Sequence, residues 1–216
     1  MDVTDDESVR KGVAAVLKCT GRIDVVINNA GMGVAGPVEE TSDNEAWLQM
    51  NTNFMGPFRV CRAVLPCMRQ KGKGLIIFVS SLAAEVGLPF QALYSASKAA
   101  LNNFAAGLQI ECLPIKVVVV EPGDIHTPFT EHRIMAIGHS SASSYKERCR
   151  TAIRSQEEAE RKGGDPKKIA SLMWRIIQSP SPRFCYRIGP DAALVGLGRL
   201  LPPRLVQKLV ASNYGL

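Results

Sequence analysis

The sequence predicts an α/β fold in which helices cover both faces of a parallel β-sheet. Short apolar runs, of which 75–79 and 117–120 are the most continuous, have the composition of strands that are buried on both faces. Segments with apolar residues at helical spacing alternate with these runs, and such alternation is typical of a parallel sheet. The chain has 216 residues, 46% of them hydrophobic, and no internal repeat, so we expect a single domain over residues 1–216.

The individual elements follow from start, stop and periodicity signals. Thr4-Asp5-Asp6-Glu7 is a capping-box pattern that predicts the start of the first helix, and Gly21 ends that helix. Asp165-Pro166 supplies an N-cap and a proline in the first turn of a later helix. The expected elements, in chain order, are helix 6–19, strand 23–28, helix 43–69, strand 75–80, helix 94–113, strand 117–121, helix 165–178 and strand 184–188.

Two segments do not fit this alternation. Residues 124–164 are polar, irregular and too long for an ordinary connection. Residues 190–216 contain an apolar helix candidate over 192–201 and an amphipathic segment over 205–210. We expect the second segment to be a C-terminal extension of the domain.

The formal charge of +6 is concentrated in the C-terminal part of the chain. Residues 131–216 contain 15 Lys and Arg against 7 Asp and Glu, whereas residues 1–130 contain 11 against 13. We interpret the excess as a solvated basic face, and the alternative is attraction to an anionic membrane surface or to a phosphorylated cofactor. No basic stripe is interleaved with aromatic residues, so the sequence does not favour nucleic-acid binding.

The sequence also favours a cytoplasmic protein without a metal site. No apolar run approaches the roughly 18 residues that a membrane span needs, and the acidic start is the opposite of a signal peptide. The six cysteines are scattered without a C-x-x-C, and the three histidines share no metal-like spacing. Buried free thiols are therefore expected.

Ser81, Tyr94 and Lys98 form a set with the chemistry of carbonyl–alcohol redox catalysis. On a helix, Tyr94 and Lys98 stand at i and i+4 on one face, so that their polar ends can converge. Ser81 directly follows the apolar strand 75–80. The end of a strand and the start of a helix can therefore share one pocket, and the set points to an enzyme.

On the basis of these three residues and the motifs below, residues 2 to about 189 resemble the short-chain dehydrogenase/reductase family. Ser81, Tyr94 and Lys98 match its catalytic serine, tyrosine and lysine, and three further motifs follow the family's order. These motifs are Asn28-Asn29-Ala30-Gly31 (NNAG), Asn53-Phe54-Met55-Gly56 (N-x-x-G) and Pro122-Gly123 to Thr127 (P-G-x-x-x-T). The resemblance implies a Rossmann-like, doubly wound sheet in a three-layer αβα arrangement, NAD or NADP as cofactor, and interconversion of an alcohol with a ketone or aldehyde.

The resemblance also implies the role of each residue. Tyr94 is the acid/base, Lys98 lowers the pKa of Tyr94 and hydrogen-bonds the nicotinamide ribose, and Ser81 holds the substrate oxygen. Asn53 anchors a water that links Lys98 to solvent. The implied cofactor contacts are Asp2, Asn28, Ala30, Gly31, Tyr94, Lys98, Pro122, Gly123, Ile125 and Thr127.

Within the family, the chain is most similar to the 17β-hydroxysteroid and retinol dehydrogenase branch. This similarity implies an apolar steroid, retinoid or lipid-like substrate that binds under a lid over 124–164. The alternative is a smaller ketone, which would account equally for the apolar residues of the expected pocket. The expected pocket residues are Leu82, Val86, Phe90, Phe129 and Met135. In this family, helices such as 43–69 and 94–113 pack against a second copy, so we expect a homodimer or homotetramer with apolar surface from Phe54, Phe58, Leu101 and Phe104.

The glycine-rich opening of a dinucleotide-binding fold is not found before the first strand. Asp2-Val3 resembles the end of the family's third strand, so about 50 to 60 residues, nearly two βαβ units, are expected to be absent on the N-terminal side. Gly31-Met32-Gly33 is interpreted as a turn close to the cofactor and not as a phosphate cradle. We therefore interpret the chain as an N-terminally truncated form that by itself binds NAD or NADP poorly, with a catalytically silent interaction or dimerisation module as the alternative.

Overall fold

The centre of the protein is a four-stranded parallel sheet with the strand order β1-β3-β4-β6. The computed structural model describes residues 1–138, 143–198 and 200–216. The strands of the sheet are β1 (Val25–Asn28), β3 (Leu75–Val79), β4 (Lys116–Pro122) and β6 (Cys185–Ile188). Two short strands, β2 (Val34–Ala35) and β5 (Ile134–Met135), pair in parallel beside this sheet.

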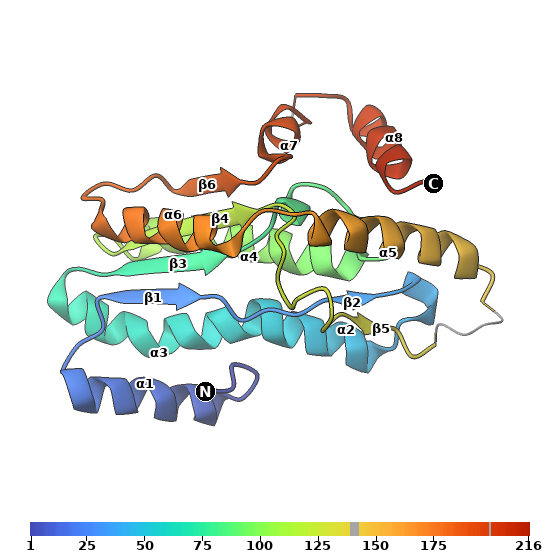
Figure 1. Cartoon of the computed structure of the whole chain (residues 1–216). Helices are drawn as coiled ribbons and strands as arrows, with labels where there is room; N and C mark the ends of the chain where they lie inside the picture. Colours follow the sequence, from blue (N-terminus) through green and yellow to red (C-terminus); the bar gives the residue numbers. More distant parts are fainter. Residues whose placement is uncertain (139–142, 199) are drawn as a thin grey trace.

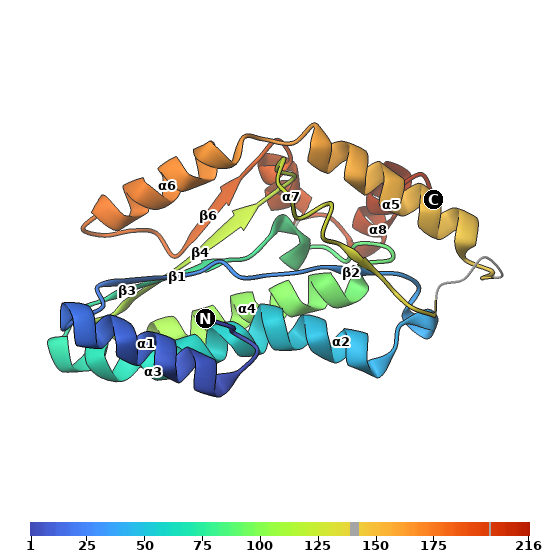
Figure 2. The ribbon, with the colours of Figure 1, turned by 60° about the horizontal axis from the view of Figure 1, so that its bottom comes forward.

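Helices cover both faces of the sheet, which gives the three-layer arrangement visible in Figure 2. One core packs β3 and β4 against α1, α3 and α4 and includes Val9, Met68, Phe78 and Leu101. The second core lies on the opposite face, where Leu172 and Ile176 of α6 pack against β3 and β4. The helices are α1 (Asp6–Thr20), α2 (Asp43–Met50), α3 (Gly56–Lys71), α4 (Ala92–Glu111), α5 (Lys146–Arg161), α6 (Pro166–Gln178), α7 (Ala192–Gly198) and α8 (Pro203–Asn213) (Figure 1). This arrangement confirms the Rossmann-like fold class expected from the sequence.

The expected long helix over 43–69 is present with a change of pitch in its middle. Between α2 and α3 the chain forms a π-helical turn over Asn51–Met55. Such turns insert one extra residue per turn and are frequent at functional sites. Here the turn carries Asn53, whose side chain is fully buried.

Strand β1 is the edge of the sheet among the described residues, as the sequence predicts for the strand at 23–28. It pairs with β3 along one side, from Val25 opposite Leu75 to Asn28 opposite Phe78. On this edge Ile27 keeps 42% of its surface exposed. An apolar edge strand of this kind is one that folded proteins normally cover.

The second half of the expected lid over 124–164 is helical. Residues 146–161 form α5, which is highly charged and carries ion pairs such as Arg154 with Glu158 on its outer side. Its inner side buries Cys149, Ala152 and Ile153, followed by Gln156 and Glu160. Residues 139–142 of the expected lid lie outside the described residues.

No helix in the described ranges combines the length and the apolar character that crossing a membrane requires.

Candidate active site

The carboxyl ends of the parallel strands meet at one edge of the sheet, where they open into a cavity. The chain leaves β1 at Asn29, β3 at Ser80 and Ser81, and β4 at Gly123. All of these residues line a cavity of about 1220 Å³, together with Tyr94 and Lys98 from the first two turns of α4. Ligands of open α/β sheets bind at this edge. The fold therefore brings Ser81, Tyr94 and Lys98 together, as the spacing predicts.

Tyr94 is half-buried, and its phenol is hydrogen-bonded with the Ser81 hydroxyl. Burial raises the pKa of Tyr94 to about 12, while the hydrogen bond with Ser81 acts in the opposite direction. Ser81 is itself held in place because its hydroxyl accepts a hydrogen bond from the Ala83 N–H at 3.1 Å. At neutral pH the side chain of Tyr94 is therefore a phenol that can donate a proton.

Lys98 is buried and lies against the face of the tyrosine ring. Its Nζ is 5.8 Å from the centre of the Tyr94 ring and donates a hydrogen bond to the carbonyl oxygen of Val79 at 2.9 Å. Burial lowers the pKa of Lys98 to about 8. Lys98 does not contribute to the pKa of Tyr94, which burial of the phenol dominates, and the ammonium lies over the ring and is bonded to the Val79 carbonyl.

Asn53 fixes the turn that follows β1. Its Oδ1 accepts from the Met32 N–H at 2.9 Å, and its Nδ2 donates to the Met32 carbonyl at 2.9 Å and to Ser97 Oγ at 3.0 Å. Ser97 in turn donates to the Tyr94 carbonyl at 2.7 Å. The side chain thus joins the turn to α4 and positions Gly31, where an added Cβ would lie 3.4 Å from Lys98 Nζ.

Only part of the expected cofactor set lines the cavity. The residues that do are Gly31, Tyr94, Lys98, Pro122, Gly123, Ile125 and Thr127. Asn28 is instead buried with its amide 4.0 Å from Cys61 Sγ, Ala30 is exposed outside the cavity, and the carboxylate of Asp2 accepts from Thr4 near the start of α1. These three residues therefore do not line the cavity with the other expected cofactor contacts.

The turn after β1 does not cradle a phosphate by itself. Gly31, Gly33 and Gly36 have the spacing G-x-G-x-x-G, which in nucleotide-binding folds leads into a helix whose N-terminus faces the phosphates. Here the chain continues into strand β2 and a 3-10 turn over Val38–Glu40. The structure agrees with the interpretation of this segment as a turn beside the site.

The apolar part of the cavity includes three of the five expected pocket residues. Leu82, Val86 and Phe129 line it, and the Phe129 ring lies 5.7 Å from that of Tyr94. Phe90 and Met135 do not line it. Phe90 packs against Tyr145 and the cluster around Cys149, and Met135 pairs with Ala35 in the small sheet.

The sequence did not indicate that three C-terminal helices form a large part of the cavity wall. Their lining residues are mostly apolar and comprise Ile169, Ala170 and Met173 of α6, Leu194 and Val195 of α7, Leu201, and Val206, Leu209 and Val210 of α8. The helical spacing of the apolar residues in α6 and α8 is a signal, but it does not distinguish a cavity wall from core packing.

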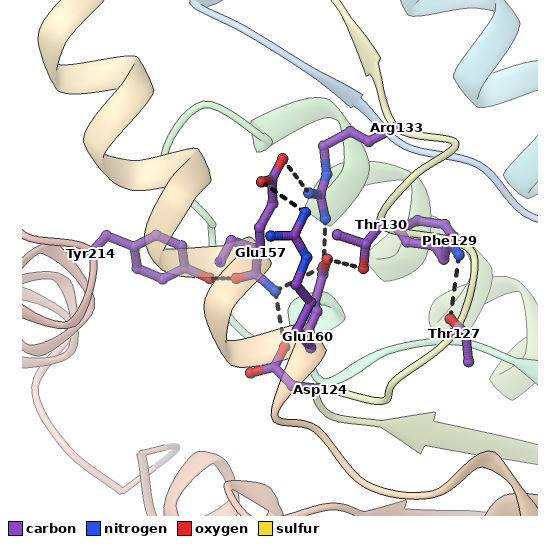
Figure 3. A network of polar contacts seen from close by, with 10 residues as sticks. Asp124, Thr127, Phe129, Thr130, Arg133, Glu157, Glu160 and Tyr214 are labelled. Atoms are coloured by element: carbon purple, nitrogen blue, oxygen red, sulfur yellow. Dashed lines mark hydrogen bonds and ion pairs between the residues drawn. The ribbon is translucent and has the colours of Figure 1, made fainter.

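A polar network that the sequence also did not indicate lies beside this wall (Figure 3). Gln156 is its centre: its Nε2 donates to Asp124 Oδ1 at 2.8 Å and to Glu160 Oε1 at 3.0 Å, and its Oε1 accepts from the Tyr214 hydroxyl. Glu160 also accepts from Thr130 at 2.7 Å and pairs with Arg133. Burial raises the pKa of Asp124, and the hydrogen bond from Gln156 acts in the opposite direction. Repulsion from the Glu160 carboxylate adds to the rise. The network joins α5, the loop after β4 and the C-terminal residues.

The chain belongs to the short-chain dehydrogenase family. The model of this family, described as short chain dehydrogenase, matches residues 1–136. A relative, the 3-ketodihydrosphingosine reductase of Bacteroides thetaiotaomicron, is 39% identical over 192 residues, which are 88% of this chain and 71% of that protein. Mouse 17-beta-hydroxysteroid dehydrogenase type 1 is 31% identical over 86% of this chain, and human retinol dehydrogenase 8 is 40% identical over 63%. The matches span 55% and 43% of these two proteins.

Solved structures agree with this assignment. A short-chain dehydrogenase from Streptomyces avermitilis is 31% identical and superposes with a TM-score of 0.82, covering 98% of this chain and 76% of that one. A short-chain dehydrogenase from Burkholderia cenocepacia, crystallised in complex with NADP, is 26% identical with a TM-score of 0.68 and covers 97% of this chain and 78% of its own.

Proposed function

We propose that this protein is an NAD(P)-dependent oxidoreductase that interconverts a ketone and an alcohol on a lipid-like substrate, with Ser81, Tyr94 and Lys98 as catalytic residues. The observation that carries the proposal is the single cavity that holds this triad at one end and an apolar wall from α6 to α8 along its length. Packing alone gives no reason for a buried lysine and a tyrosine to face a cavity next to a serine.

The chain's own residues account for the proton transfer. The Ser81 hydroxyl and the Tyr94 phenol converge on the place where a substrate carbonyl oxygen would be held. Tyr94 would donate its proton to the carbonyl oxygen, and a bound reduced nicotinamide would supply the hydride to the carbonyl carbon. Burial raises the pKa of Tyr94 to about 12, so the phenol carries its proton at neutral pH and can act as the acid when a carbonyl is reduced.

The residues at the strand ends fit the nicotinamide half of the cofactor. Gly31 and Gly123 leave the cavity open: a Cβ at Gly31 would approach Lys98 Nζ and Asn53 Oδ1, and a Cβ at Gly123 would lie 3.0 Å from Leu82 Cδ1. We infer that Gly31, Gly123 and Thr127 contact the nicotinamide end and that Lys98 hydrogen-bonds the ribose. Either NAD or NADP satisfies these contacts. The family resemblance also implies cofactor contacts for Asp2, Asn28 and Ala30, and these three residues lie outside the cavity lining.

The substrate class follows from the lining of the cavity. Its strand-end side would hold the nicotinamide, and the rest of the cavity of about 1220 Å³ is bounded by the mostly apolar wall from α6 to α8. The name of the Bacteroides relative describes a reductase of a long-chain keto lipid. We infer that this chain also acts on an aliphatic, lipid-like ketone, in preference to a rigid steroid or a retinoid.

The same proposal includes self-association and contact with a membrane surface. Trp47 and Leu48 of α2 and Ile110 of α4 are exposed apolar side chains on two helices that we expect to pack against a second copy. Of the four residues expected to form this surface, Leu101 is buried in the core, while Phe54, Phe58 and Phe104 pack on one another and stay partly exposed. The basic C-terminal half would face the anionic membrane surface.

The test is the oxidation of NADH and of NADPH by the complete native protein with a series of aliphatic 3-ketones of increasing length. Each added methylene that enters the apolar wall contributes about 0.8 kcal/mol, so kcat/KM should rise about fourfold per methylene until the cavity is full. A flat dependence on chain length would contradict the substrate class. If neither dinucleotide is oxidised with any ketone, the chain is instead a catalytically silent interaction module.

A further inference from the structure

Helices α7 and α8 and the turn between them expose leucines at the mouth of the cavity and outside it. Leu197 and Leu200 are 61% and 83% exposed and Leu205 is 43% exposed, and none of the three lines the cavity. Leu194 and Leu209 line the cavity and are also exposed, so they lie at its mouth. Figure 1 shows both helices along one edge of the molecule, beyond β6 and α5. Single exposed leucines are ordinary, but four on two consecutive short helices and a fifth, Leu200, in the turn between them form a patch.

The charge of this segment is of one sign. Residues 192–216 contain three Lys and Arg and no Asp or Glu. On α8, Arg204 and Lys208 are exposed and lie one turn apart, directly beside the stripe formed by Leu205 and Leu209. A leucine stripe flanked by cations is the pattern of a helix that lies in the plane of a membrane interface, with leucines among the acyl chains and cations at the headgroups.

The rest of the fold holds this patch in place. The C-terminal end of α8 is attached to α5 through the Tyr214 hydroxyl on Gln156 and through Ser155 Oγ, which donates to the Asn213 carbonyl at 3.1 Å. Tyr214 is buried although it is the third residue from the C-terminal end of the described chain. The leucines are therefore displayed on helices that are fixed to the body of the protein.

We propose that the α7–α8 patch, defined as Leu194, Leu197, Leu200, Leu205 and Leu209 with Arg204 and Lys208, docks on an anionic lipid bilayer and turns the mouth of the cavity toward it. Docking itself depends only on this surface. The consequence that the keto lipid enters the cavity directly from the bilayer rests on the function proposed above.

The alternative partner for the α7–α8 patch is a second copy of the chain. A two-fold contact through this patch would bring the same Arg204 and Lys208 from both copies into one interface, and no acidic residue of 192–216 could neutralise them. An anionic lipid surface complements the patch in both its apolar and its charged part. The observations therefore favour the bilayer.

The experiment is co-sedimentation of the complete native protein with phosphatidylcholine vesicles that contain one third phosphatidylglycerol, compared with pure phosphatidylcholine. We expect preferential binding to the anionic vesicles. Replacing both cations, Arg204→Gln with Lys208→Gln, should weaken that binding about thirtyfold, and Leu197→Glu with Leu205→Glu should weaken it at least tenfold on both vesicles. The matched control is Val38→Glu, which removes an apolar side chain of similar exposure on another part of the surface and should bind like the parent.

A second readout does not depend on variants that remove binding. Leu200→Trp should show quenching of its added fluorescence by vesicles of brominated phosphatidylcholine mixed with phosphatidylglycerol, and Val38→Trp should not. Absence of quenching, or equal vesicle binding by the parent and the leucine variant, would overturn the proposal. Sedimentation in which the leucine variant converts a dimer into a monomer, without any vesicle binding by the parent, would assign the patch to a second copy instead.

The route of the substrate is tested separately from the proposed function. The leucine variant should lose reduction of a long-chain ketone supplied in vesicles and keep reduction of a short, water-soluble ketone. Vesicle binding by a protein that reduces neither ketone would leave docking intact and refute the proposed function alone. Equal loss of both reactions would contradict the entry route.

Discussion

Asn53→Ala should cost the protein both stability and activity, because this side chain carries the link between the turn after β1 and α4. The substitution removes three hydrogen bonds, two to Met32 and one to Ser97, and leaves the Met32 N–H and carbonyl without these partners. Each buried polar group left unsatisfied costs about 1–3 kcal/mol. Since Met32 is half-buried and water can reach part of it, we expect the free energy of unfolding to fall by about 2–4 kcal/mol.

Urea unfolding of the parent and the variant measures this loss directly. The matched control is Asn103→Ala, because Asn103 is an exposed asparagine of α4 whose amide donates to the Ala99 carbonyl of the same helix. Its replacement should change the free energy of unfolding by less than about 0.5 kcal/mol. If Asn53→Ala changes stability as little as the control, the hydrogen bonds around Met32 do not hold the turn and the reasoning fails.

Other predictions concern pH, the C-terminal attachment and the serine. Burial lowers the pKa of Lys98 to about 8 from its ordinary 10.5, so the cost of burying its charge is present below pH 8 and disappears as the pH rises to 10.5. In urea titrations, Lys98→Met should therefore raise the free energy of unfolding by about 2–3 kcal/mol at pH 7 but not at pH 10.5. The variant should also lose activity. An equal gain in stability at both pH values would show that the charge of Lys98 is not the cause. Tyr214→Phe removes the hydrogen bond to Gln156 and should speed hydrogen exchange of α8 several-fold with little change in the sheet, and uniform exchange would contradict a local attachment. Ser81→Ala should raise the pKa of Tyr94 further and lower kcat about a hundredfold, with Ser81→Thr recovering part of the rate; full activity of the alanine variant would remove Ser81 from the mechanism.

Local signals in the sequence were sufficient for the sheet and for the catalytic helix. The apolar runs at 75–79 and 117–120 match β3 and β4, and the i, i+4 spacing of Tyr94 and Lys98 places both in the cavity. Both results depend on neighbouring residues along the chain, and sequence patterns report such relations well. The turn at Gly31 and the serine at the end of β3 follow from the same logic.

What the sequence did not predict depends on contacts between distant segments. The bounds of helix α5 within the expected lid were not predicted, because its inner face contains the polar residues Gln156 and Glu160, whose partners come from Asp124, Arg133 and Tyr214. The pKa of Tyr94 likewise depends on how deeply the phenol is buried under Phe129 and not on the proximity of Lys98 in the sequence. The cavity wall from α6 to α8 can be recognised only once the C-terminal helices are placed in three dimensions.

The central claim is that Tyr94 supplies the proton in a reaction in which NAD(P)H reduces a ketone. Its most direct test is single-turnover oxidation of NADH or NADPH by the complete native protein and by Tyr94→Phe, with a long-chain ketone as substrate. Tyr145→Phe is the matched control, because Tyr145 is also half-buried and packs its ring 6.4 Å from that of Phe90, away from the triad. We expect Tyr94→Phe to slow the reaction by at least about a hundredfold with unchanged dinucleotide affinity, while Tyr145→Phe reacts like the parent. A rate for Tyr94→Phe within about threefold of the parent would contradict the account.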